Sequence, residues 1–283
     1  MSRSVEWPAL PYEEWRDTCD ALHAHTQALG KLAAALAPPE PQLQHAAAAR
    51  RSRLADTAAA PDRSGALAVE LDLCAHEAVA RHSDGREERI PLAPARSVGT
   101  VTRDLLAAVR SLGGPVEIDL TPHETPWQTP LDHDEEHTRY DTAAVERYFA
   151  AATRAAFVLT ALRAPYRGRA TPVNAWWGSF DLAVSLFSGV PADPPADGLI
   201  TRNAMDAEEV AVGWWPGDQR HPRPAFYAYA HPARLGSQTQ RSRRPALSRS
   251  AAFTTCATPT RPSPSAPVYQ WSRSRASSAR ASR

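Results

Sequence analysis

Apolar positions recur at helical spacing in three parts of the chain. The first part lies between Pro11 and Pro38, and its mostly apolar positions follow at intervals of three or four: Trp15, Cys19, Leu22, Thr26, Leu29, Leu32 and Leu36. Proline at the start and acidic residues in the first turn favour a helix here. Ser97 and Asp141 suit the N-caps of two more helices, which we expect over about 97–113 and 142–164.

Alternating apolar and polar positions predict strands elsewhere. In residues 67–73, leucine and valine alternate with alanine, glutamate and aspartate. The turn residues 83–85, Ser-Asp-Gly, then predict a hairpin between strands near 75–82 and 86–91. The same alternation predicts four further strands, at 116–120, 180–186, 210–214 and 226–230.

Together, these elements indicate one α+β domain. Helices and strands are interspersed without a repeating βα unit, so we expect a mainly antiparallel sheet packed with three helices. The domain should cover residues 5–232, with an irregular insert at 46–63 where an alanine- and arginine-rich sequence breaks the pattern. Residues 233–283 should form a disordered tail, because they are rich in arginine and serine and show no sustained period.

The tail allows three interpretations. It carries ten of the 32 basic residues of the chain and none of the 31 acidic ones, so the remainder of the chain is acidic. An arginine-rich arm would bind nucleic acid or another anionic surface through phosphate contacts. We favour the second interpretation, a GC-rich coding sequence read in the wrong frame, which the single lysine, Lys31, supports. An inert linker is the third interpretation. Nucleic acid is therefore an expected partner only if the tail is genuine.

Hydropathy and cysteine content exclude other classes of protein. No run approaches the ~20 apolar residues that span a bilayer, and the first residues lack the apolar core of a signal peptide. We therefore expect a cytoplasmic protein without a membrane partner. The cysteines are odd in number and form no CxxC pair, which argues against a disulfide framework or a cysteine zinc site: Cys19, Cys74 and Cys256. No cofactor is expected.

A histidine pair is the candidate for a metal site. His133 and His137 are four residues apart, a spacing that on a helix places both side chains on one face. The zinc-protease pattern needs glutamate directly after the first histidine, however, and Asp134 stands there. The pair also lies in a proline-rich segment, 121–140, that we expect to be a surface loop. A solvated acidic loop is the favoured interpretation, and no metal is expected.

Four of the eight tryptophans stand in two adjacent pairs near predicted strands. Because neighbouring residues on a strand face opposite sides, each pair should put one ring in the core and one on the other face. An outward ring with polar neighbours can form the floor of a pocket for a flat or sugar-like small molecule. The candidate ligand-binding residues are Arg169, Asn174, Trp176, Trp177, Trp214 and Trp215. Ordinary packing between sheet and helices is the alternative use of these rings.

A hydrolase-like enzyme is the competing class of function. Asp181 with Glu208 or Glu209 would supply a pair of carboxylates for general acid and base catalysis. An exposed acidic cluster at a strand entry is the simpler interpretation of the two glutamates. The sequence holds no GxSxG, GxGxxG or Walker pattern, which leaves serine hydrolase and nucleotide-binding architectures without support. Whether the protein is an enzyme stays open at this point.

The tryptophan-rich segments carry a resemblance to a family. The matching stretches are Trp7–Pro11 with Trp15, the loop 130–141, Thr171–Gly189, Trp215–Gly217 and Phe226–Tyr229. They resemble a bacterial family of uncharacterised proteins, the domain of unknown function DUF5996, over most of residues 5–232. This resemblance implies no reaction, cofactor or partner. It fades at 46–63 and after 232, which supports a frame error and predicts a domain that lacks one strand and its C-terminal cover.

Overall fold

The fold is that of a computed structural model of the 283-residue chain, which describes residues 7–50, 54–62, 65–114, 117–233 and 268–269. Four α-helices lie in these ranges: α1 (Tyr12–Leu36), α2 (Val98–Ser111), α3 (Thr142–Arg163) and α4 (Leu199–Ala204). Two short 3-10 helices accompany them, η1 (Pro41–Ala46) and η2 (Leu131–His133).

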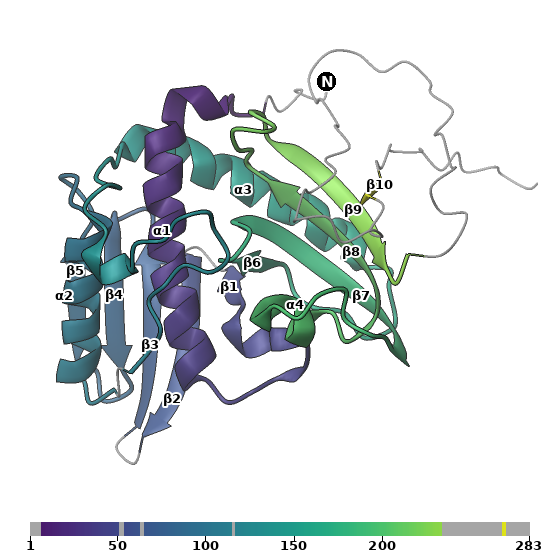
Figure 1. The fold of residues 1–283 in the computed structure, drawn as a ribbon, viewed down its shortest axis with the longest axis horizontal. Helices are drawn as coiled ribbons and strands as arrows, with labels where there is room; N and C mark the ends of the chain where they lie inside the picture. Colours follow the sequence, from purple (N-terminus) through teal and green to yellow (C-terminus); the bar gives the residue numbers. More distant parts are fainter. Residues whose placement is uncertain (1–6, 51–53, 63–64, 115–116, 234–267, 270–283) are drawn as a thin grey trace, which may run out of the picture.

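The described strands form one ten-stranded antiparallel sheet (Figure 1). Their order in the sheet is β10-β9-β8-β7-β6-β1-β2-β3-β4-β5. The bounds are β1 (Ala48–Arg50), β2 (Leu54–Asp62), β3 (Gly65–Asp72), β4 (Glu77–His82), β5 (Glu87–Pro91), β6 (Asn174–Trp176), β7 (Asp181–Pro191), β8 (Ala207–Trp215), β9 (Ala225–His231) and β10 (Val268–Tyr269). The short β1 joins an N-terminal meander, β2–β5, to a C-terminal one, β6–β9.

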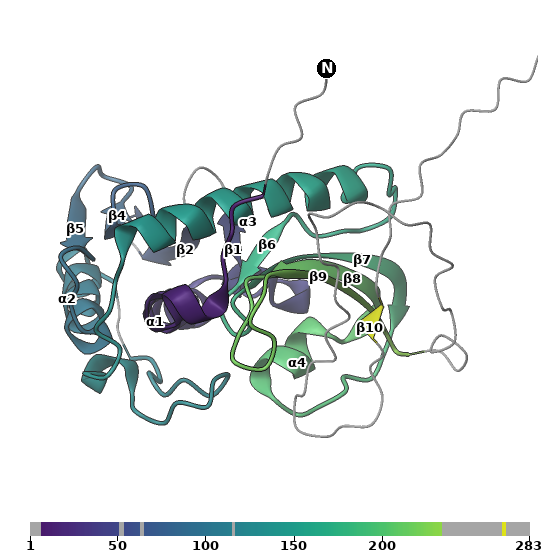
Figure 2. The ribbon, with the colours of Figure 1, turned by 90° about the horizontal axis from the view of Figure 1, so that it is seen from above.

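Helices cover both faces of the sheet. In Figure 1, α1 and α2 lie in front of the N-terminal meander, whereas α3 lies behind β7–β9. The view from above places α3 and α4 on opposite sides of these C-terminal strands (Figure 2). On the front of β7–β9 lies the short α4, which packs against η1.

Side-chain caps fix the starts of α2 and α3, as the sequence predicts. The Ser97 hydroxyl accepts a hydrogen bond from the Thr100 N–H at 3.1 Å. The Asp141 carboxylate accepts from the N–H groups of Ala143 and Ala144 at 2.9 and 3.3 Å. These bonds satisfy donors that have no partner within the helix, so each helix begins where its cap stands.

Stacked aromatic rings join α1, α3 and the C-terminal meander. Tyr148 of α3 stacks on Trp15 of α1 and on Phe180, with centroid distances of 5.4 and 5.2 Å. Trp214 of β8 is 1% exposed, and its ring lies 6.1 Å from that of Tyr148. Large apolar side chains that are fully buried stabilise a fold by roughly 2–3 kcal/mol each. The core between α1, α3 and β8 therefore holds the two meanders and their helices together.

Most of the predicted elements are confirmed. The three long helices match the predicted segments within two residues at most ends, and β4 and β5 form the predicted hairpin. β7, β8 and β9 contain the strand segments predicted after residue 180. The α+β class with a mainly antiparallel sheet is confirmed as well.

Three expectations about the fold are wrong. Residues 117–120 form no strand, and the Leu120 carbonyl instead accepts from the N–H of Leu131, the first residue of η2, at 3.0 Å. The segment 46–63 is not irregular throughout, because it contains β1 and β2, whose backbone hydrogen bonds need no apolar alternation. A fourth helix, α4, is present, and its six residues are too few to show a helical period.

Little of the predicted tail falls within the described residues. After Ala233, only Val268 and Tyr269 are described, and they pair with Tyr229 and Ala228 of β9. The predicted disorder of the remaining tail lies outside the described residues, as does the arginine-rich sequence on which the nucleic-acid and frame-error interpretations depend. In the part of the chain that is described, no helix has the length and apolar character needed to cross a membrane.

Candidate functional site

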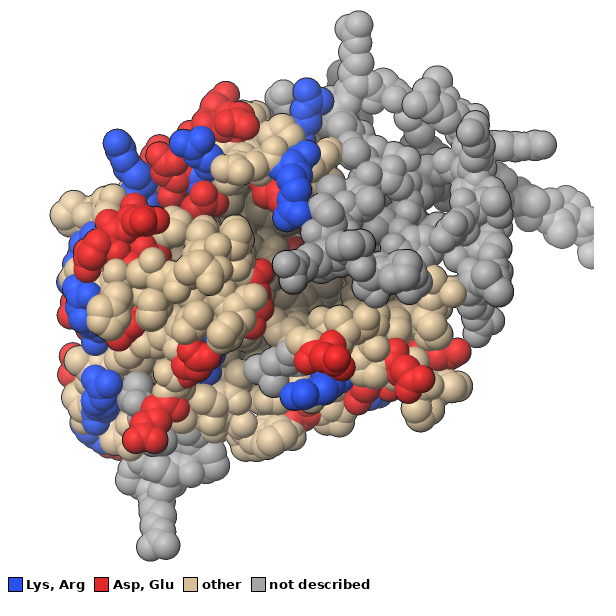
Figure 3. Space-filling view, viewed as in Figure 1, with Lys and Arg blue, Asp and Glu red and all other residues tan. Residues whose placement is uncertain are grey.

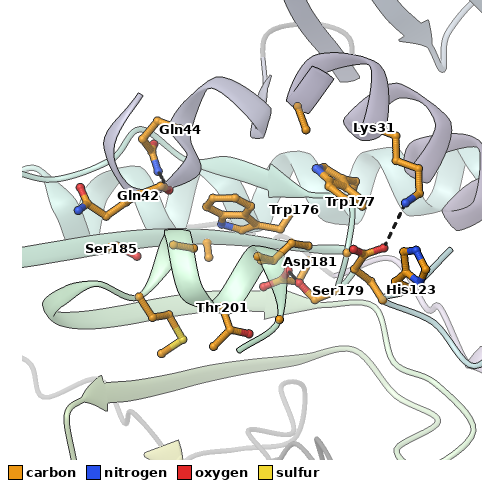
Figure 4. Close-up of a pocket in the computed structure, with 18 of the residues that line it drawn as sticks. Lys31, Gln42, Gln44, His123, Trp176, Trp177, Ser179, Asp181, Ser185 and Thr201 are labelled. Carbon is orange, nitrogen blue, oxygen red and sulfur yellow. Dashed lines mark hydrogen bonds and ion pairs between the residues drawn. The ribbon is translucent and has the colours of Figure 1, made fainter. Parts of the chain in front are cut away.

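A cavity of about 910 Å³ lies on the front of the C-terminal meander. Its walls come from the end of α1, from η1, from α4 and from the segment 117–124 (Figure 4). Because side chains on a strand alternate, the residues of β7 and β9 that face the cavity are two positions apart. The strand residues that line it include Asp181, Ala183, Ser185, Phe187, Tyr227 and Tyr229. Its volume lies within the range of small-molecule sites.

The end of β6 places two tryptophans at this cavity. The strand ends at Trp176, and the chain turns back toward β7 with the Phe180 N–H donating to the Trp176 carbonyl at 2.8 Å. Phe180 adopts a φ of +55°, a left-handed conformation that few residues other than glycine adopt. Since Trp177 lies in this turn and not in the strand, both rings line the cavity. The expectation that the two rings face opposite sides is therefore wrong for this pair.

Hydrogen bonds hold Trp177 in place, whereas part of the Trp176 side chain is exposed. The Trp177 indole N–H donates to the Ala46 carbonyl at 3.0 Å, and its own carbonyl accepts from Gln27 Nε2 at 2.9 Å. Nε2 of His23 lies 2.9 Å from the same carbonyl oxygen. Trp177 is 4% exposed, while Trp176 is only half-buried and lies in the middle of the cavity in Figure 4. Trp176 is therefore the ring available to a bound molecule.

Asp181 is a buried carboxylate with two hydroxyl partners. It is 5% exposed, and the hydroxyl groups of Ser179 and Tyr227 donate to its two oxygens. Burial raises the pKa of Asp181 above its ordinary value, and the two hydroxyl bonds oppose that rise. The Tyr227 ring lies over Gly213, where any Cβ would overlap it. Glycine at 213 therefore lets Tyr227 reach the carboxylate.

Glu209 forms a second buried carboxylate farther along the sheet. It is 5% exposed and lines the cavity, so the expectation of an exposed strand-entry cluster is wrong for this residue. Burial raises the pKa of Glu209, and hydrogen bonds from Ser185 and Tyr229 oppose the rise. The Tyr229 hydroxyl lies 3.4 Å from the carboxylate, and its ring stacks parallel to that of Tyr227 at 6.2 Å. Each buried carboxylate thus has its own tyrosine.

The register of β7 and β8 separates the two buried carboxylates. Because Phe187 pairs with Glu209, Asp181 and Glu209 are offset by six residues on neighbouring strands, roughly 20 Å along the sheet. The carboxylates of hydrolases that act as a pair lie about 5–10 Å apart. Glu208 points to the other face of β8, where it accepts a hydrogen bond from the Ser188 hydroxyl at 2.9 Å. The structure therefore does not bring together the predicted acid–base pair.

One end of the cavity carries paired charges. Lys31 Nζ lies 3.8 Å from a carboxylate oxygen of Glu124 and 5.6 Å from the centroid of the Trp177 ring (Figure 4). Nearby, Nε2 of His123 lies 2.7 Å from the Asp119 carboxylate. Lys31 and His123 thus each already have an acidic partner at this end of the cavity.

The other end of the cavity is lined by amides. Asn174 Nδ2 donates to Gln44 Oε1 at 2.8 Å, which explains why Asn174 itself is 2% exposed and does not line the cavity. Gln42 Nε2 donates to Asp206 at 2.5 Å. Gln42 Oε1 is buried and has no hydrogen-bond partner in the described part of the chain. An acceptor is therefore left over in the cavity wall.

Besides Asn174, three more of the six predicted ligand-binding residues do not line the cavity. Trp214 is in the core, so the expected split between core and opposite face is confirmed for this ring. Trp215 stacks on His221 at 5.8 Å, outside the cavity. The Arg169 guanidinium lies 5.0 Å from the Phe187 ring and does not line the cavity either. Of the predicted ligand-binding residues, Trp176 and Trp177 line the cavity. Of the predicted catalytic carboxylates, Asp181 and Glu209 line it.

The predicted histidine pair forms no metal site in the described chain. His133 contacts Asp132 at 2.9 Å, and His137 contacts the Asp134 carboxylate at 2.7 Å. No group of three or more potential metal-ligating side chains is found among the residues described. The loop is less solvated than expected, because Asp134 is 3% exposed and accepts from the N–H groups of Glu136 and His137.

Several cavity residues escape the sequence patterns. Lys31, Gln42 and Gln44 come from α1 and η1, and no local signal indicates that they face β7. A signal does exist for Tyr227 and Tyr229, since their spacing of two places both on one face of a strand. On the face shown in Figure 3, acidic and basic side chains are interspersed over the described surface, and no broad basic area is seen there.

Comparison with known proteins identifies a family and no activity. No curated protein and no solved structure matches the chain. The model of a family of unknown function, DUF5996, matches residues 7–255. This range contains α1 to α4 and the whole cavity, with both buried carboxylates and both tryptophans. The chain therefore belongs to the DUF5996 family.

Proposed function

We propose that the protein binds a small polar ligand in the cavity beside Trp176. One observation carries this proposal: a half-buried indole ring and two buried carboxylates line the same volume of about 910 Å³. An aromatic face gives a bound molecule contact area, and a few fixed polar groups orient it.

The rigidity of the polar groups supports the proposal. Asp181 is held by Ser179 and Tyr227, and Trp177 by Gln27 and Ala46. Groups that are already held in place lose little conformational freedom when a ligand binds, so less of the binding free energy is offset. A cavity of this kind favours binding over simple packing of rings.

Titration of the intrinsic tryptophan fluorescence tests the proposal. Sugars, amino acids, amines and nucleosides would be added in turn to the full chain, to Trp176→Ala and to Trp215→Ala. Trp215 is a matched control, since its ring is also half-buried and lies outside the cavity. We expect at least one class to give a saturable signal in the wild type and the control, and none in Trp176→Ala. A signal that persists in Trp176→Ala would contradict the proposal.

The same titrations separate binding from catalysis. Each ligand that binds would be incubated with the protein and analysed for products by mass spectrometry. We expect unchanged ligand. Product formation that Asp181→Asn abolishes would instead support the hydrolase-like alternative, with Asp181 acting without a carboxylate partner. The proposed setting is the bacterial cytoplasm, and fractionation of cells that express the protein tests it.

A further inference from the structure

We infer that the ligand of this cavity is an organic cation, a small molecule that carries a protonated amine or a guanidinium group. The inference rests on the proposed function and adds the chemical class of the ligand. Three independent features of the lining lead to it: the balance of charges, the kind of polar atom left without a partner, and the aromatic rings.

The charges of the lining favour a cation. Five acidic residues line the cavity, against one lysine and one histidine. Lys31 is paired with Glu124 and His123 with Asp119. The remaining acidic residues are Glu117, Asp181 and Glu209. Asp181 and Glu209 are buried and are bonded to hydroxyl groups, and no described cationic side chain pairs with either. A bound cation would supply the missing charge, whereas an anion would meet like charges at short range.

The buried side-chain atoms of the cavity lining that lack a hydrogen bond among the described residues are acceptors. Gln42 is 7% exposed and lines the cavity, its Nε2 is committed to Asp206, and its Oε1 has no partner among the described residues. Oε2 of Glu124 is buried without a hydrogen bond as well, and its partner is the Lys31 ammonium group at 3.8 Å. A buried acceptor without a donor costs free energy, so a ligand rich in N–H donors is stabilised here. Ammonium and guanidinium groups are donors only.

The aromatic rings suit the same ligand. Trp176, Tyr227 and Tyr229 line the cavity, and the two tyrosine rings are parallel within 5°. Cations are attracted to the faces of indole and phenol rings, and this attraction increases when water is excluded. A neutral sugar would contact the rings but would lack the electrostatic attraction of a cation to their faces. Its hydroxyl oxygens would also place further acceptors opposite the carboxylates.

Three probes of equal chain length test the inference. 1,4-Diaminobutane, 1,4-butanediol and succinate are a dication, a neutral diol and a dianion on the same carbon chain. Binding of each to the full chain would be measured by calorimetry and by tryptophan fluorescence. We expect 1,4-diaminobutane to bind at least about tenfold more tightly than the diol, because charge-assisted hydrogen bonds are about twice as strong as neutral ones. Succinate should not bind.

Isosteric variants assign the contact. Asp181→Asn and Glu209→Gln remove one negative charge each and keep the side-chain shape. Because the two carboxylates are offset by six residues on neighbouring strands, roughly 20 Å along the sheet, the short diamine reaches only one of them. One of the two variants should therefore weaken binding of the diamine by about tenfold or more, and the other should leave it nearly unchanged. Glu208→Gln is the matched control, since it is adjacent in sequence and faces the other side of β8. The affinity of the Glu208→Gln variant for the diamine should stay within about twofold of that of the wild type. Circular dichroism confirms that each variant is folded.

The results distinguish this inference from the function on which it rests. If the diol or succinate binds as tightly as the diamine and Trp176→Ala abolishes that binding, the inference is wrong and the small-ligand site stands. If the diamine binds equally to the wild type, Asp181→Asn and Glu209→Gln, the inference is also wrong. If no probe binds while a neutral compound of the wider panel does, the cavity selects another class of ligand and the inference is overturned.

Discussion

The indole ring of Trp177 lies directly over Gly30 of α1, in space that any side chain at residue 30 would occupy. The ring is one wall of the cavity, and the helix that carries Gly30 also carries Lys31 at the cavity end. The backbone of α1 and the wall of the proposed site are therefore in direct contact, and a single added methyl group should disturb both.

We expect Gly30→Ala to destabilise the protein by about 1–3 kcal/mol, the usual cost of an overpacked core. If nothing contacted residue 30, the same substitution would stabilise the protein, because alanine is more favourable than glycine inside a helix by about 1 kcal/mol. Urea denaturation measures the difference. In a Trp177→Ala background, the same change should no longer destabilise. A loss of stability that is equal in both backgrounds would show that the ring is not the cause.

Removal of the Tyr227 hydroxyl should destabilise the protein more at pH 8 than at pH 4. The folded-state pKa of Asp181 is raised, so its carboxylate ionises in the folded protein only as the pH rises through that value, and stability is lost there. The Tyr227 hydroxyl stabilises the ionised form. Without it, in Tyr227→Phe, the loss at high pH grows, because a hydrogen bond to a charged group is worth about 1.5–3 kcal/mol. Unfolding free energies at the two pH values measure this difference.

The Asp181→Asn background supplies the control for that experiment. With no ionisable group at residue 181, the cost of Tyr227→Phe should be the same at both pH values. A pH-dependent cost that survives in this background would place its origin elsewhere than in the bond between Tyr227 and Asp181.

Mild acid should destabilise the fold through two buried histidines. Burial lowers the pKa of both His23 and His25 to about 4. Because the unfolded chain binds these protons near pH 6.5, stability is complete above that value and falls as the pH drops toward 4, by up to about 3 kcal/mol for each histidine. His137 acts in the opposite direction, since its bond with Asp134 raises its pKa. Urea denaturation between pH 4 and 7 measures the combined effect of these histidines on the free energy of unfolding.

His25→Gln isolates one of these contributions. The slope of stability against pH between 4 and 6.5 should become smaller in this variant. His123→Gln is the control, because His123 is on the surface and its side chain is 62% exposed. An unchanged slope in His25→Gln would mean that His25 is protonated at the same pH in the folded and unfolded chains.

The Asp134 loop should be essential to the start of α2. Carbonyl groups of Asp134 and His137 accept hydrogen bonds from the N–H groups of Gly99 and Val98 at 2.7 and 3.0 Å. The Asp134 carboxylate in turn accepts from the two N–H groups that shape the loop. Asp134→Ala leaves these donors unpaired, so we expect a loss of about 2–4 kcal/mol in the free energy of unfolding.

Glu136→Ala serves as the control for that loss. Glu136 lies in the same loop with an exposed side chain, and its removal should change stability by less than about 0.5 kcal/mol. Thermal unfolding of both variants side by side gives the comparison. Equal changes in the two variants would contradict the role of the Asp134 carboxylate.

Much of the fold can be predicted because its signals are local. The spacing of Leu22, Leu29 and Leu32 predicts α1, and the caps at Ser97 and Asp141 predict the starts of α2 and α3. Pairing between distant segments is not a local property. Residues 116–120 alternate as a strand does, yet Leu120 bonds to η2, while the alanine-rich β2 pairs with β3 without clear alternation.

The candidate site shows the same division. Trp176, Trp177, Asp181 and Glu209 stand out in the sequence by residue type, and all four line the cavity. Their neighbours there depend on tertiary structure, as for Gln42, which η1 brings to the end of the cavity beside Asp206. The strand register, which the sequence does not specify, decides that Asp181 and Glu209 lie too far apart to act as a pair.

The three-residue strand β1 has a mechanical consequence. Among the described residues it forms two pairs with β2 and two with β6, so few of the described backbone hydrogen bonds of the sheet connect the meanders on its two sides. We therefore expect the sheet to bend most easily at β1, where the fewest backbone hydrogen bonds resist bending. The cavity has walls on η1, which directly precedes β1 in the chain, and on β7, which is separated from β1 in the sheet by β6. Bending of the sheet at β1 would change the width of the cavity while both meanders stay folded.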